Sequence, residues 1–311
     1  MALSPAIRTV AIVGTGVIGR SWAAVFARAG CETRLFDVDP DQLPRARVWL
    51  DGQRKPDWGP IVACATVDAA LDTAGYVQES GPERLDVKQQ LFVDLDRAAP
   101  PSAILASSTS AFDMTEIARG LRHPERCIVA HPVNPPHVIP AVEVLGGIRT
   151  AVDVVDRTCD LLRAVGQTPV VLKKHVHGFI LNRLQFALVR EAIHLLQHDV
   201  ADVEAIDAVV REGLGLRWAL LGPFAVADTN KDDGVRAYFG GYEQWIIDLM
   251  NQLGPTPSLD GDLIERIGKA LDGARGETSR AEVREWRDRM VVEIRRLKAD
   301  NPVARVGERA Q

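Results

Sequence analysis

Residues Thr9-Val-Ala-Ile-Val13 run directly into Gly14-Thr-Gly16-Val-Ile-Gly19 near the amino terminus. Four of the first five residues are apolar, as a strand buried on both faces requires, and apolar residues at helical spacing follow the glycines. The pattern therefore predicts a strand, a glycine turn and a helix. In such a turn the first glycine permits a tight bend, the second lets a pyrophosphate approach the backbone, and the third lets the helix pack on the strand.

The context of this turn decides between a dinucleotide site and a purely steric glycine turn. A second predicted strand, Glu32-Thr-Arg-Leu-Phe-Asp37, follows the helix and ends in an acid. A carboxylate at this place accepts both ribose hydroxyls of an adenosine and repels the extra phosphate of NADP. The predicted cofactor is therefore NAD, bound by the start of the helix and the acid: Gly14, Gly16, Val17, Ile18, Gly19 and Asp37.

The composition describes an ordinary globular chain of 311 residues, which is long enough for two domains. A net charge of -5 offers no large basic surface, so we expect neither nucleic acid nor a membrane as a partner. The first buried strand leaves no room for a signal peptide, and no apolar run reaches about 18 residues, so the predicted location is cytoplasmic. The four cysteines lack paired spacing, which predicts neither a disulfide framework nor a zinc site.

Polar side chains follow the next two predicted strands. Glu79 ends one strand and Lys88 lies on the following helix, so both would lie near the nucleotide edge of the sheet. Taken alone, each is better explained as a solvated surface charge. The next predicted strand is Ala103-Ile-Leu-Ala106, and the hydroxyl residues Ser107-Ser-Thr-Ser110 follow it, where they would face the ligand crevice of a parallel sheet. For Ser107, turn and cap chemistry is the better explanation.

A proline-rich connection follows His131 and precedes Glu143. Because prolines stop either flanking strand from extending through the connection, we predict a broad hairpin that sets Glu143 beside His131. A histidine in a buried strand is usually a satisfied core residue, but one at a strand terminus with a facing carboxylate matches an oriented general base. The residues alone leave both interpretations open.

Beyond Gly178 the pattern changes to long amphipathic helices, predicted over residues 179–197, 203–212, 238–253, 263–271 and 281–297. The predicted fold is an α/β Rossmann-type, doubly wound NAD-binding domain over residues 1–175 and an all-α substrate and dimerisation domain over residues 176–311. The tail from Asp300 is polar and is expected to fray. His194 and His198 stand four apart on a predicted helix, but no third ligand accompanies them, so no metal site is predicted.

With these residues placed, the chain resembles the 3-hydroxyacyl-CoA dehydrogenase superfamily over nearly its whole length, most closely the lambda-crystallin or L-gulonate 3-dehydrogenase branch. The resemblance rests on Gly14-Thr-Gly-Val-Ile-Gly19, Gln78-Glu79-x-x-x-Glu83, Ser107-Ser-Thr-Ser110, Ala130-His-Pro-Val-Asn-Pro-Pro136, Gly178-Phe-Ile-Leu-Asn-Arg-Leu184 and Gly213-Leu-Gly-Leu-Arg217. It implies that His131 is the catalytic base and Glu143 its partner. It further implies that Ser110 and Asn182 contact the reacting oxygen of the substrate or orient the histidine.

The resemblance also bears on the cofactor. Lys88 matches a cofactor contact of the family, and Ser108 falls where relatives often have an active-site asparagine. We therefore add Glu79, Lys88 and Ser108 to the predicted NAD contacts.

Two departures from the family bear on the substrate. The segment between Asp37 and Glu79 is shorter than in relatives that oxidise acyl-CoA thioesters, where a longer helical hairpin helps to hold the coenzyme. Arg217 lies in a predicted glycine-flanked turn, expected at the cleft between the domains, and resembles the gulonate and carnitine branches. A guanidinium there would bind a carboxylate bidentately.

The leading hypothesis is NAD-dependent oxidation of a small free 3-hydroxy acid, with L-gulonate as the best single guess. Oxidation of a 3-hydroxyacyl-CoA or of L-carnitine is the alternative among enzymes. A non-catalytic, crystallin-like NAD-binding protein is the alternative of another class, and the intact set of Ser110, His131, Glu143 and Asn182 argues against it. We expect a homodimer through the helical domain, from the resemblance and the many apolar helix positions.

Overall fold

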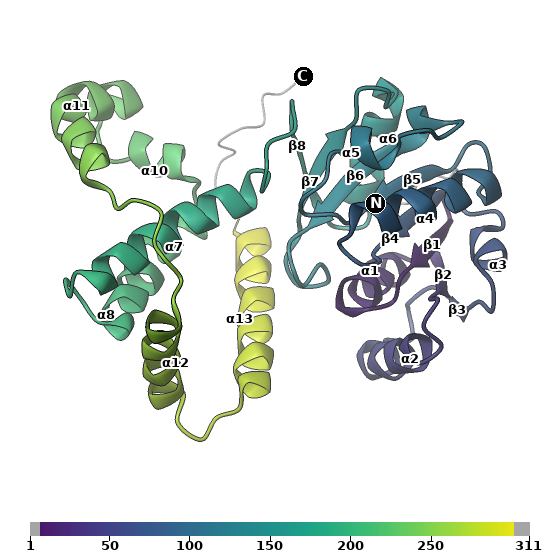
Figure 1. The fold of residues 1–311 in the computed structure, drawn as a ribbon, viewed down its shortest axis with the longest axis horizontal. Coiled ribbons are helices and arrows are strands. Elements are labelled where there is room, and N and C mark those ends of the chain that lie inside the picture. Colours follow the sequence, from purple (N-terminus) through teal and green to yellow (C-terminus); the bar gives the residue numbers. More distant parts are fainter. Residues whose placement is uncertain (1–6, 302–311) are drawn as a thin grey trace. The chain divides into compact units, whose positions relative to one another are not determined.

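Strand β1, the apolar stretch before the glycine turn, lies inside a sheet in the computed structural model, which describes residues 7–301. The chain forms two units, Met1–Arg183 and Leu184–Gln311, and each is described here by itself. Strands and helices alternate in the first unit, whereas the second is helical (Figure 1). This confirms the predicted fold class. The boundary predicted between residues 175 and 176 stays a prediction, and the tail predicted to fray lies, beyond Asn301, outside the described residues.

The sheet of the first unit has the strand order β3-β2-β1-β4-β5-β6-β7-β8. The strands are β1 (Thr9–Val13), β2 (Glu32–Phe36), β3 (Ile61–Ala63), β4 (Tyr76–Glu79), β5 (Ile104–Ser107), β6 (Cys127–Pro132), β7 (Ala141–Gly146) and β8 (Thr168–Val171). Strands β1 to β6 are parallel, β7 is antiparallel to β6, and β8 is parallel to β7. The strand order reverses between β1 and β4, and ligands of open α/β sheets bind at such a switch point, outside the carboxyl ends of the strands.

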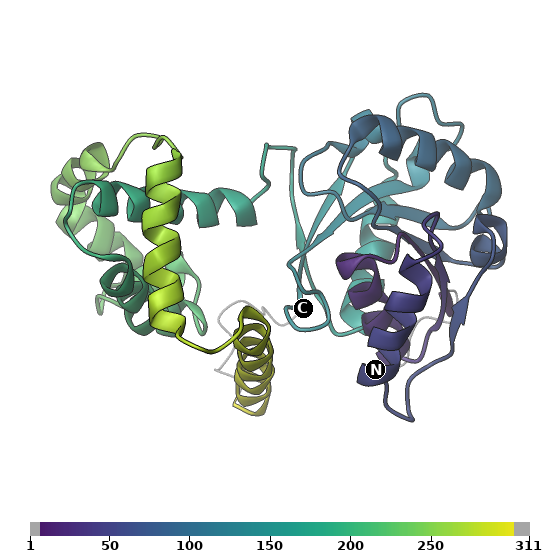
Figure 2. The same ribbon diagram turned by 60° about the horizontal axis from the view of Figure 1, so that its bottom comes forward.

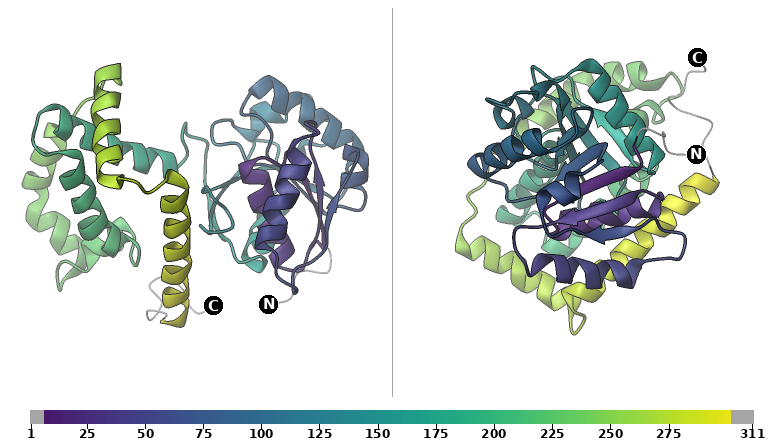
Figure 3. Two further views of the ribbon diagram at one scale, coloured as in Figure 1. Left: turned by 90° about the horizontal axis from the view of Figure 1, so that it is seen from below. Right: turned by 90° about the vertical axis from the view of Figure 1, so that its right-hand side faces the viewer.

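Helices cover both faces of this sheet (Figure 3). They are α1 (Val17–Arg28), α2 (Gln42–Gln53), α3 (Val67–Leu71), α4 (Leu85–Ala98), α5 (Met114–Ile117) and α6 (Val152–Ala164). Because side chains alternate along a strand, Ile12 packs in one apolar cluster with Trp22 of α1, and its neighbour Val13 packs in the other with Phe92 of α4. The doubly wound arrangement follows from this two-sided burial of β1.

The second unit contains helices joined by short connections (Figure 2). From the end of the first unit onward the helices are α7 (Leu181–Gln197), α8 (Val203–Ala208), the π-helix Val209–Gly215, α9 (Leu216–Trp218), α10 (Pro223–Asp228), α11 (Gly234–Gln252), α12 (Gly261–Arg275) and α13 (Arg280–Asp300). Among the described residues of this unit, the only buried hydrophobic ones are Leu196, Val226, Ala227 and Leu263. Phe224 and Trp245, in contrast, are 77% and 63% exposed. These helices therefore present large apolar surfaces that one chain leaves uncovered.

The cysteines and the hydropathy of the helices give two further findings. Cys31, Cys64, Cys127 and Cys159 are buried free thiols, as expected of small core residues. Within residues 7–301, no helix combines the length and the apolar content that crossing a membrane demands.

Candidate active site and cofactor site

The three glycines of the turn after β1 have three different surroundings. Gly14 has a φ of +89°, and a Cβ atom there would lie 2.8 Å from the backbone of Ser80. A Cβ at Gly19 would lie 1.8 Å from the carbonyl oxygen of Gly14. Beside Gly16, however, no atom lies within 4 Å of the place a Cβ would take. The first and third glycines are thus required by the bend and by the packing of α1, and the second leaves open space for a phosphate.

The first turn of α1 is free to bind an anion. The helix starts at Val17, its N-cap residue Gly16 makes no side-chain capping hydrogen bond, and its first turn contains no acidic residue. The N–H groups of the first turn of a helix have no partner within the helix, and the helix dipole adds positive potential there. The predicted contacts Val17, Ile18 and Gly19 lie in this turn, so the residues present fit the pyrophosphate of a dinucleotide.

Asp37 directly follows β2 and lies against the glycine turn. Its Oδ2 atom accepts hydrogen bonds from the N–H group of Thr15, at 2.5 Å, and from the Thr15 hydroxyl, at 2.9 Å. Its Oδ1 atom accepts from the N–H group of Asp39 at 3.0 Å. Asp37 remains partly exposed, and a carboxylate offers about four acceptor positions, so it retains capacity for a ribose hydroxyl. Its contact with the ribose of NAD stays a prediction.

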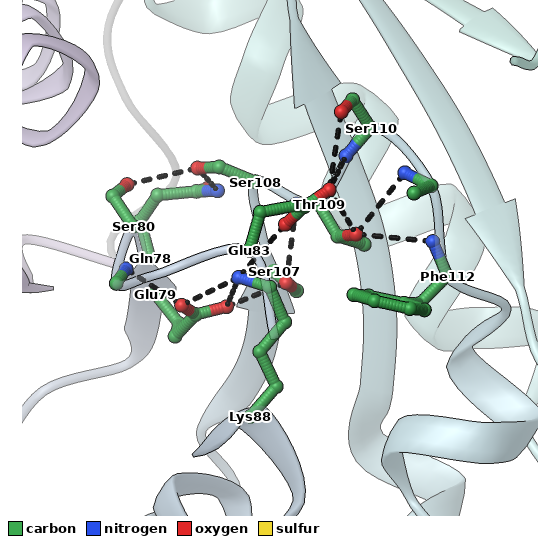
Figure 4. Close-up of polar contacts among 12 residues, drawn as sticks. Gln78, Glu79, Ser80, Glu83, Lys88, Ser107, Ser108, Thr109, Ser110 and Phe112 are labelled. Carbon is green, nitrogen blue, oxygen red and sulfur yellow. Dashed lines mark hydrogen bonds and ion pairs between the residues drawn. The ribbon is translucent and has the colours of Figure 1, made fainter. Parts of the chain in front are cut away.

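Glu79 and Lys88 form a buried ion pair (Figure 4). The exposed fractions are 0% for Glu79 and 1% for Lys88, and the Lys88 Nζ atom lies 2.9 Å from Glu79 Oε1 and 3.1 Å from Glu79 Oε2. The interpretation of each as a solvated surface charge is wrong, because the two charges satisfy each other inside the first unit. Lys88 also lies 3.3 Å from Glu83 Oε2. Direct contact of Glu79 and Lys88 with NAD stays a prediction.

The hydroxyl groups of Ser107-Ser-Thr-Ser110 have three sets of partners: Glu79, the pair Gln78 and Ser80, and Glu83 (Figure 4). Ser107 is fully buried and donates to Glu79 Oε2 at 2.5 Å. It also accepts from the Thr109 N–H group at 3.2 Å, which is the turn chemistry expected of this residue. The Ser108 hydroxyl accepts from Gln78 Nε2 at 2.8 Å and contacts the Ser80 hydroxyl at 2.9 Å. Gln78 and Ser108 thus tie the ends of β4 and β5 together beside the switch point of the sheet.

Glu83 holds the remaining hydroxyls of the cluster. Its Oε1 atom accepts from the Ser110 N–H group at 2.7 Å, the Thr109 hydroxyl at 2.8 Å and the Ser110 hydroxyl at 3.1 Å. Burial by itself would raise the pKa of Glu83, but the Lys88 ammonium and the hydrogen bonds from Ser110 and Thr109 hold that pKa below its usual value. Glu83 is a site residue that was not predicted from the sequence, and its position four residues after Glu79, in Gln78-Glu79-x-x-x-Glu83, is the one local signal for it.

His131 and Glu143 are directly opposite each other in the antiparallel pair of β6 and β7. The His131 Nδ1 atom lies 2.9 Å from Glu143 Oε2, which confirms the predicted hairpin and the predicted pairing of the two side chains. Both residues are buried, with exposed fractions of 8% and 4%. A carboxylate at Nδ1 favours the neutral tautomer that carries its proton there, and this tautomer leaves the Nε2 lone pair available to accept a proton.

The other oxygen of Glu143 binds the start of α7. Oε1 accepts from the N–H groups of Ile180, at 2.8 Å, and Leu181, at 3.0 Å. Burial by itself would raise the pKa of Glu143, but the hydrogen bonds from His131, Leu181 and Ile180 hold that pKa below its usual value. The carboxylate is therefore ionised at neutral pH. The buried ring of Phe179 packs edge-on against His131 with 5.4 Å between centroids, so the imidazole is held on two sides.

Asn182 and Ser110 lie in segments adjoining this pair. Asn182 follows Leu181, whose N–H group Glu143 binds, and it is partly buried; its side chain has no hydrogen-bond partner among residues 7–301. Ser110 follows β5, whose neighbour β6 carries His131. Asn182 thus follows a residue that binds Glu143, and Ser110 follows the strand that neighbours the His131 strand. Their contacts with a substrate stay predictions.

Arg217 lies in α9, directly after the π-helix, so the predicted glycine-flanked turn is wrong. Gly215 has φ and ψ of -61° and -41°, which are helical values. Glycine permits a turn but does not require one, and here the backbone continues through Gly213 and Gly215 as helix. The Arg217 side chain is exposed, and its Nε atom donates to the Gly213 carbonyl at 3.4 Å. Its contact with a substrate carboxylate stays a prediction.

Models of two domains of one family match this chain. The model of the 3-hydroxyacyl-CoA dehydrogenase NAD-binding domain matches residues 9–175, and the model of the C-terminal domain of the same family matches residues 178–257.

Relatives match nearly the whole chain. A lambda-crystallin homolog of Bos taurus is 38% identical, over 94% of this chain and 96% of the relative. An L-carnitine dehydrogenase of Streptomyces griseus is 36% identical, over 98% of this chain and 93% of the relative. Among solved structures, FHMPC 5-dehydrogenase, an NAD+ dependent dismutase, is 31% identical with a TM-score of 0.80, over 94% of this chain and 98% of that one. Together with the glycine turn and the His131–Glu143 pair, these matches establish that the chain belongs to the 3-hydroxyacyl-CoA dehydrogenase family and is an NAD-dependent dehydrogenase.

Proposed function

We propose that this enzyme oxidises the 3-hydroxyl group of a small free 3-hydroxy acid to a ketone, with L-gulonate as the best single candidate. The observation that carries the reaction is the buried His131–Glu143 pair, whose Nδ1–Oε2 distance is 2.9 Å. Oxidation of a secondary alcohol requires a base that removes the hydroxyl proton, and a neutral imidazole titrates near the working pH of such a reaction.

His131 accepts the hydroxyl proton at Nε2, because Glu143 occupies Nδ1. As the proton arrives, the ring becomes an imidazolium, and the adjacent ionised carboxylate stabilises its positive charge. Glu143 carries out this role without losing its own position, because Ile180 and Leu181 hold its second oxygen. NAD+, when bound at the glycine turn, supplies the hydride-accepting chemistry.

Ser110 and Asn182 support the charge that develops on the reacting oxygen. A preorganised hydrogen-bond donor aimed at such an oxygen lowers the activation free energy by about 2.7–4 kcal/mol. Asn182 suits this role because its amide makes no hydrogen bond within residues 7–301. Ser110 suits it because, within the same residues, its hydroxyl bonds to Glu83 alone, at 3.1 Å.

A free carboxylate on the substrate is supported by the names of two relatives. L-carnitine is a 3-hydroxy acid with a free carboxylate, and FHMPC is a pyridine carboxylic acid. The segment between Asp37 and Glu79 forms α2, β3 and the short helix α3, without the long helical hairpin expected of an enzyme that binds coenzyme A. Arg217 is the proposed anchor of the carboxylate, because guanidinium and carboxylate groups pair bidentately.

A screen of substrates by NADH absorbance tests this proposal. It compares L-gulonate, L-carnitine, 3-hydroxybutyrate and 3-hydroxybutyryl-CoA with the wild-type enzyme. We expect turnover of at least one free acid, L-gulonate first, and a lower kcat/KM for the thioester. L-carnitine is the second candidate, because a relative with that name is 36% identical. Activity on the thioester alone would overturn the free-acid proposal in favour of a 3-hydroxyacyl-CoA dehydrogenase.

We also propose that the enzyme is a homodimer formed through its helical unit. The support is the exposed apolar surface of this unit, which includes Phe224 and Trp245, because apolar patches of this kind commonly mark interfaces. Sedimentation velocity at micromolar protein concentration should give twice the mass of the chain. A monomeric mass would reject the proposal.

A further inference from the structure

The Glu83 carboxylate connects the two loops that follow β4 and β5 (Figure 4). Glu83 lies between β4 and α4, and its Oε1 atom collects three donors from Thr109 and Ser110 in the loop after β5. Its Oε2 atom lies 3.3 Å from the Lys88 ammonium, which the buried Glu79 binds from the other side. Glu83 is thus anchored at one oxygen and presents the other to Ser110.

The three bonds to Oε1 are unequal. The Ser110 N–H group and the Thr109 hydroxyl lie 2.7 and 2.8 Å away, whereas the Ser110 hydroxyl lies 3.1 Å away. A carboxylate oxygen has two lone pairs, so a third donor on the same atom makes the weakest contact. The Ser110 hydroxyl is therefore the donor that leaves Glu83 at least cost.

The Thr109 hydroxyl has no comparable freedom. It accepts hydrogen bonds from the N–H groups of Ala111, at 3.2 Å, and Phe112, at 3.1 Å, so its single proton is committed to Glu83. Thr109 is also fully buried, whereas Ser110 is partly exposed. Glu83 consequently fixes the loop through two short bonds, one from the Ser110 N–H group and one from the Thr109 hydroxyl. The Ser110 hydroxyl remains able to turn to another acceptor.

We propose that Glu83 is a positioning residue for Ser110: it holds the Ser110 backbone in place and keeps the hydroxyl oriented until the reacting oxygen of the substrate replaces Glu83 as its acceptor. This inference rests on the role of Ser110 in the proposed function and extends it to a residue outside the predicted site. Glu83 acts through Ser110, so its contribution to turnover requires the Ser110 hydroxyl.

A double-mutant cycle tests this dependence. kcat and KM are measured for Glu83→Gln, Ser110→Ala and the double variant, with the free acid of the screen that the wild type oxidises fastest. Each single variant should lower kcat about 100-fold, as the loss of one preorganised donor does, with a smaller change in KM. The double variant should be no slower than Ser110→Ala within about threefold, because residues that act as a unit are not additive.

A second variant and a control protect the test against misfolding. Glu83→Asp keeps the charge beside Lys88 but shortens the side chain, so it should lose turnover through Ser110 in the same way. Asp86→Asn removes an exposed acid of the same region, which pairs with Arg84 at 2.6 Å, and should leave kcat unchanged. Melting temperatures and NAD+ affinity, followed by fluorescence titration, show that each variant is folded and binds the cofactor.

The outcomes separate this inference from the proposed function. Multiplied losses in the double variant would overturn the positioning role of Glu83 and leave the proposed function intact. Full turnover by Ser110→Ala would overturn the roles of both Glu83 and Ser110, while oxidation of the free acid through His131 and Glu143 would stand. If the wild type oxidises none of the screened acids, the proposed function fails. Urea unfolding of the wild type, the two single variants and the double variant then measures the Glu83–Ser110 contact without substrate. Absence of coupling between Glu83 and Ser110 in that cycle would overturn the inference on its own.

Discussion

Glu143→Gln tests the proposed base most directly, because it preserves the size of the side chain and removes its charge. Glu143 Oε1 accepts from the N–H groups of Ile180 and Leu181 at 2.8 and 3.0 Å, and Oε2 faces His131 Nδ1 at 2.9 Å. A glutamine has a single acceptor oxygen, and the two backbone N–H groups both require it. Its NH2 group is then left facing His131 Nδ1.

This orientation inverts the tautomer of His131. Nδ1 must accept from the glutamine, so the ring proton moves to Nε2, and the neutral imidazole can no longer take a proton from the substrate there. In a serine-protease triad the corresponding change from carboxylate to amide lowers kcat about 10⁴-fold through the same wrong tautomer. We expect a loss in kcat of roughly 10³- to 10⁴-fold here, with His131→Ala as slow and the double variant no slower.

The assay follows NADH absorbance across neutral and mildly alkaline pH, with the acid that the wild type oxidises fastest in the screen. Fluorescence titration with NADH measures the affinity for the cofactor, which should stay unchanged. Glu125→Gln is a matched control, because Glu125 also pairs with a histidine, His123, at 3.2 Å, but on the exposed surface. A wild-type kcat of Glu143→Gln across neutral pH, or an equal loss of kcat in the control variant, would contradict the role of Glu143 in setting the tautomer of His131.

Three further predictions concern the cofactor, the substrate and stability. Asp37 should make the enzyme strongly prefer NAD+, because a carboxylate repels a 2′-phosphate; comparable kcat/KM with NADP+ would contradict this role. Arg217→Met should lower kcat/KM for the free acid roughly 10- to 150-fold at unchanged NAD+ affinity, because it removes a hydrogen bond between two charged groups. Full activity of the variant on every acid that the wild type oxidises would exclude Arg217 as the anchor of the substrate carboxylate. Asp96, a buried acid of α4, pairs with Arg126 at 2.9 Å. Burial by itself would raise the pKa of Asp96, but hydrogen bonds from Arg126 and from the N–H groups of His123 and Arg122 hold that pKa below the usual value. The pKa values of Glu83 and Glu143 also lie below their ordinary values in the folded protein. Their stabilisation is therefore complete above the unfolded pKa values, near 4.5 for glutamate and 3.8 for aspartate, and is lost as pH falls through the folded values. The free energy of unfolding, measured with urea, should accordingly be independent of these groups' titration at neutral pH and should fall as the pH becomes acidic. Asp96→Asn should make this fall shallower.

Local patterns in the sequence predicted the parts of the site that depend on neighbours along the chain. The glycine turn and Asp37 belong to one β1–α1–β2 unit, whose connections are short. His131 and Glu143 meet because one hairpin joins their strands and the prolines between them set its ends. In each case the residues that must meet are separated by one turn or one helix, and the chain itself brings them together.

The burial of charged residues, contacts between neighbouring strand ends and some backbone conformations were decided by the tertiary structure alone. The sequence around a charged residue is the same whether its side chain contacts solvent or a buried ion-pair partner. Lys88 is buried beside Glu79 only because α4 packs against the sheet. Glu83 likewise acquires a role only when the loop after β5 brings Ser110 to its carboxylate. Gly215 permits both a turn and a helix, so sequence left its conformation open and the continuing helix decided it. The physical reason is common to all three: burial and backbone conformation at these positions depend on which other elements pack there, and residue type does not carry that information.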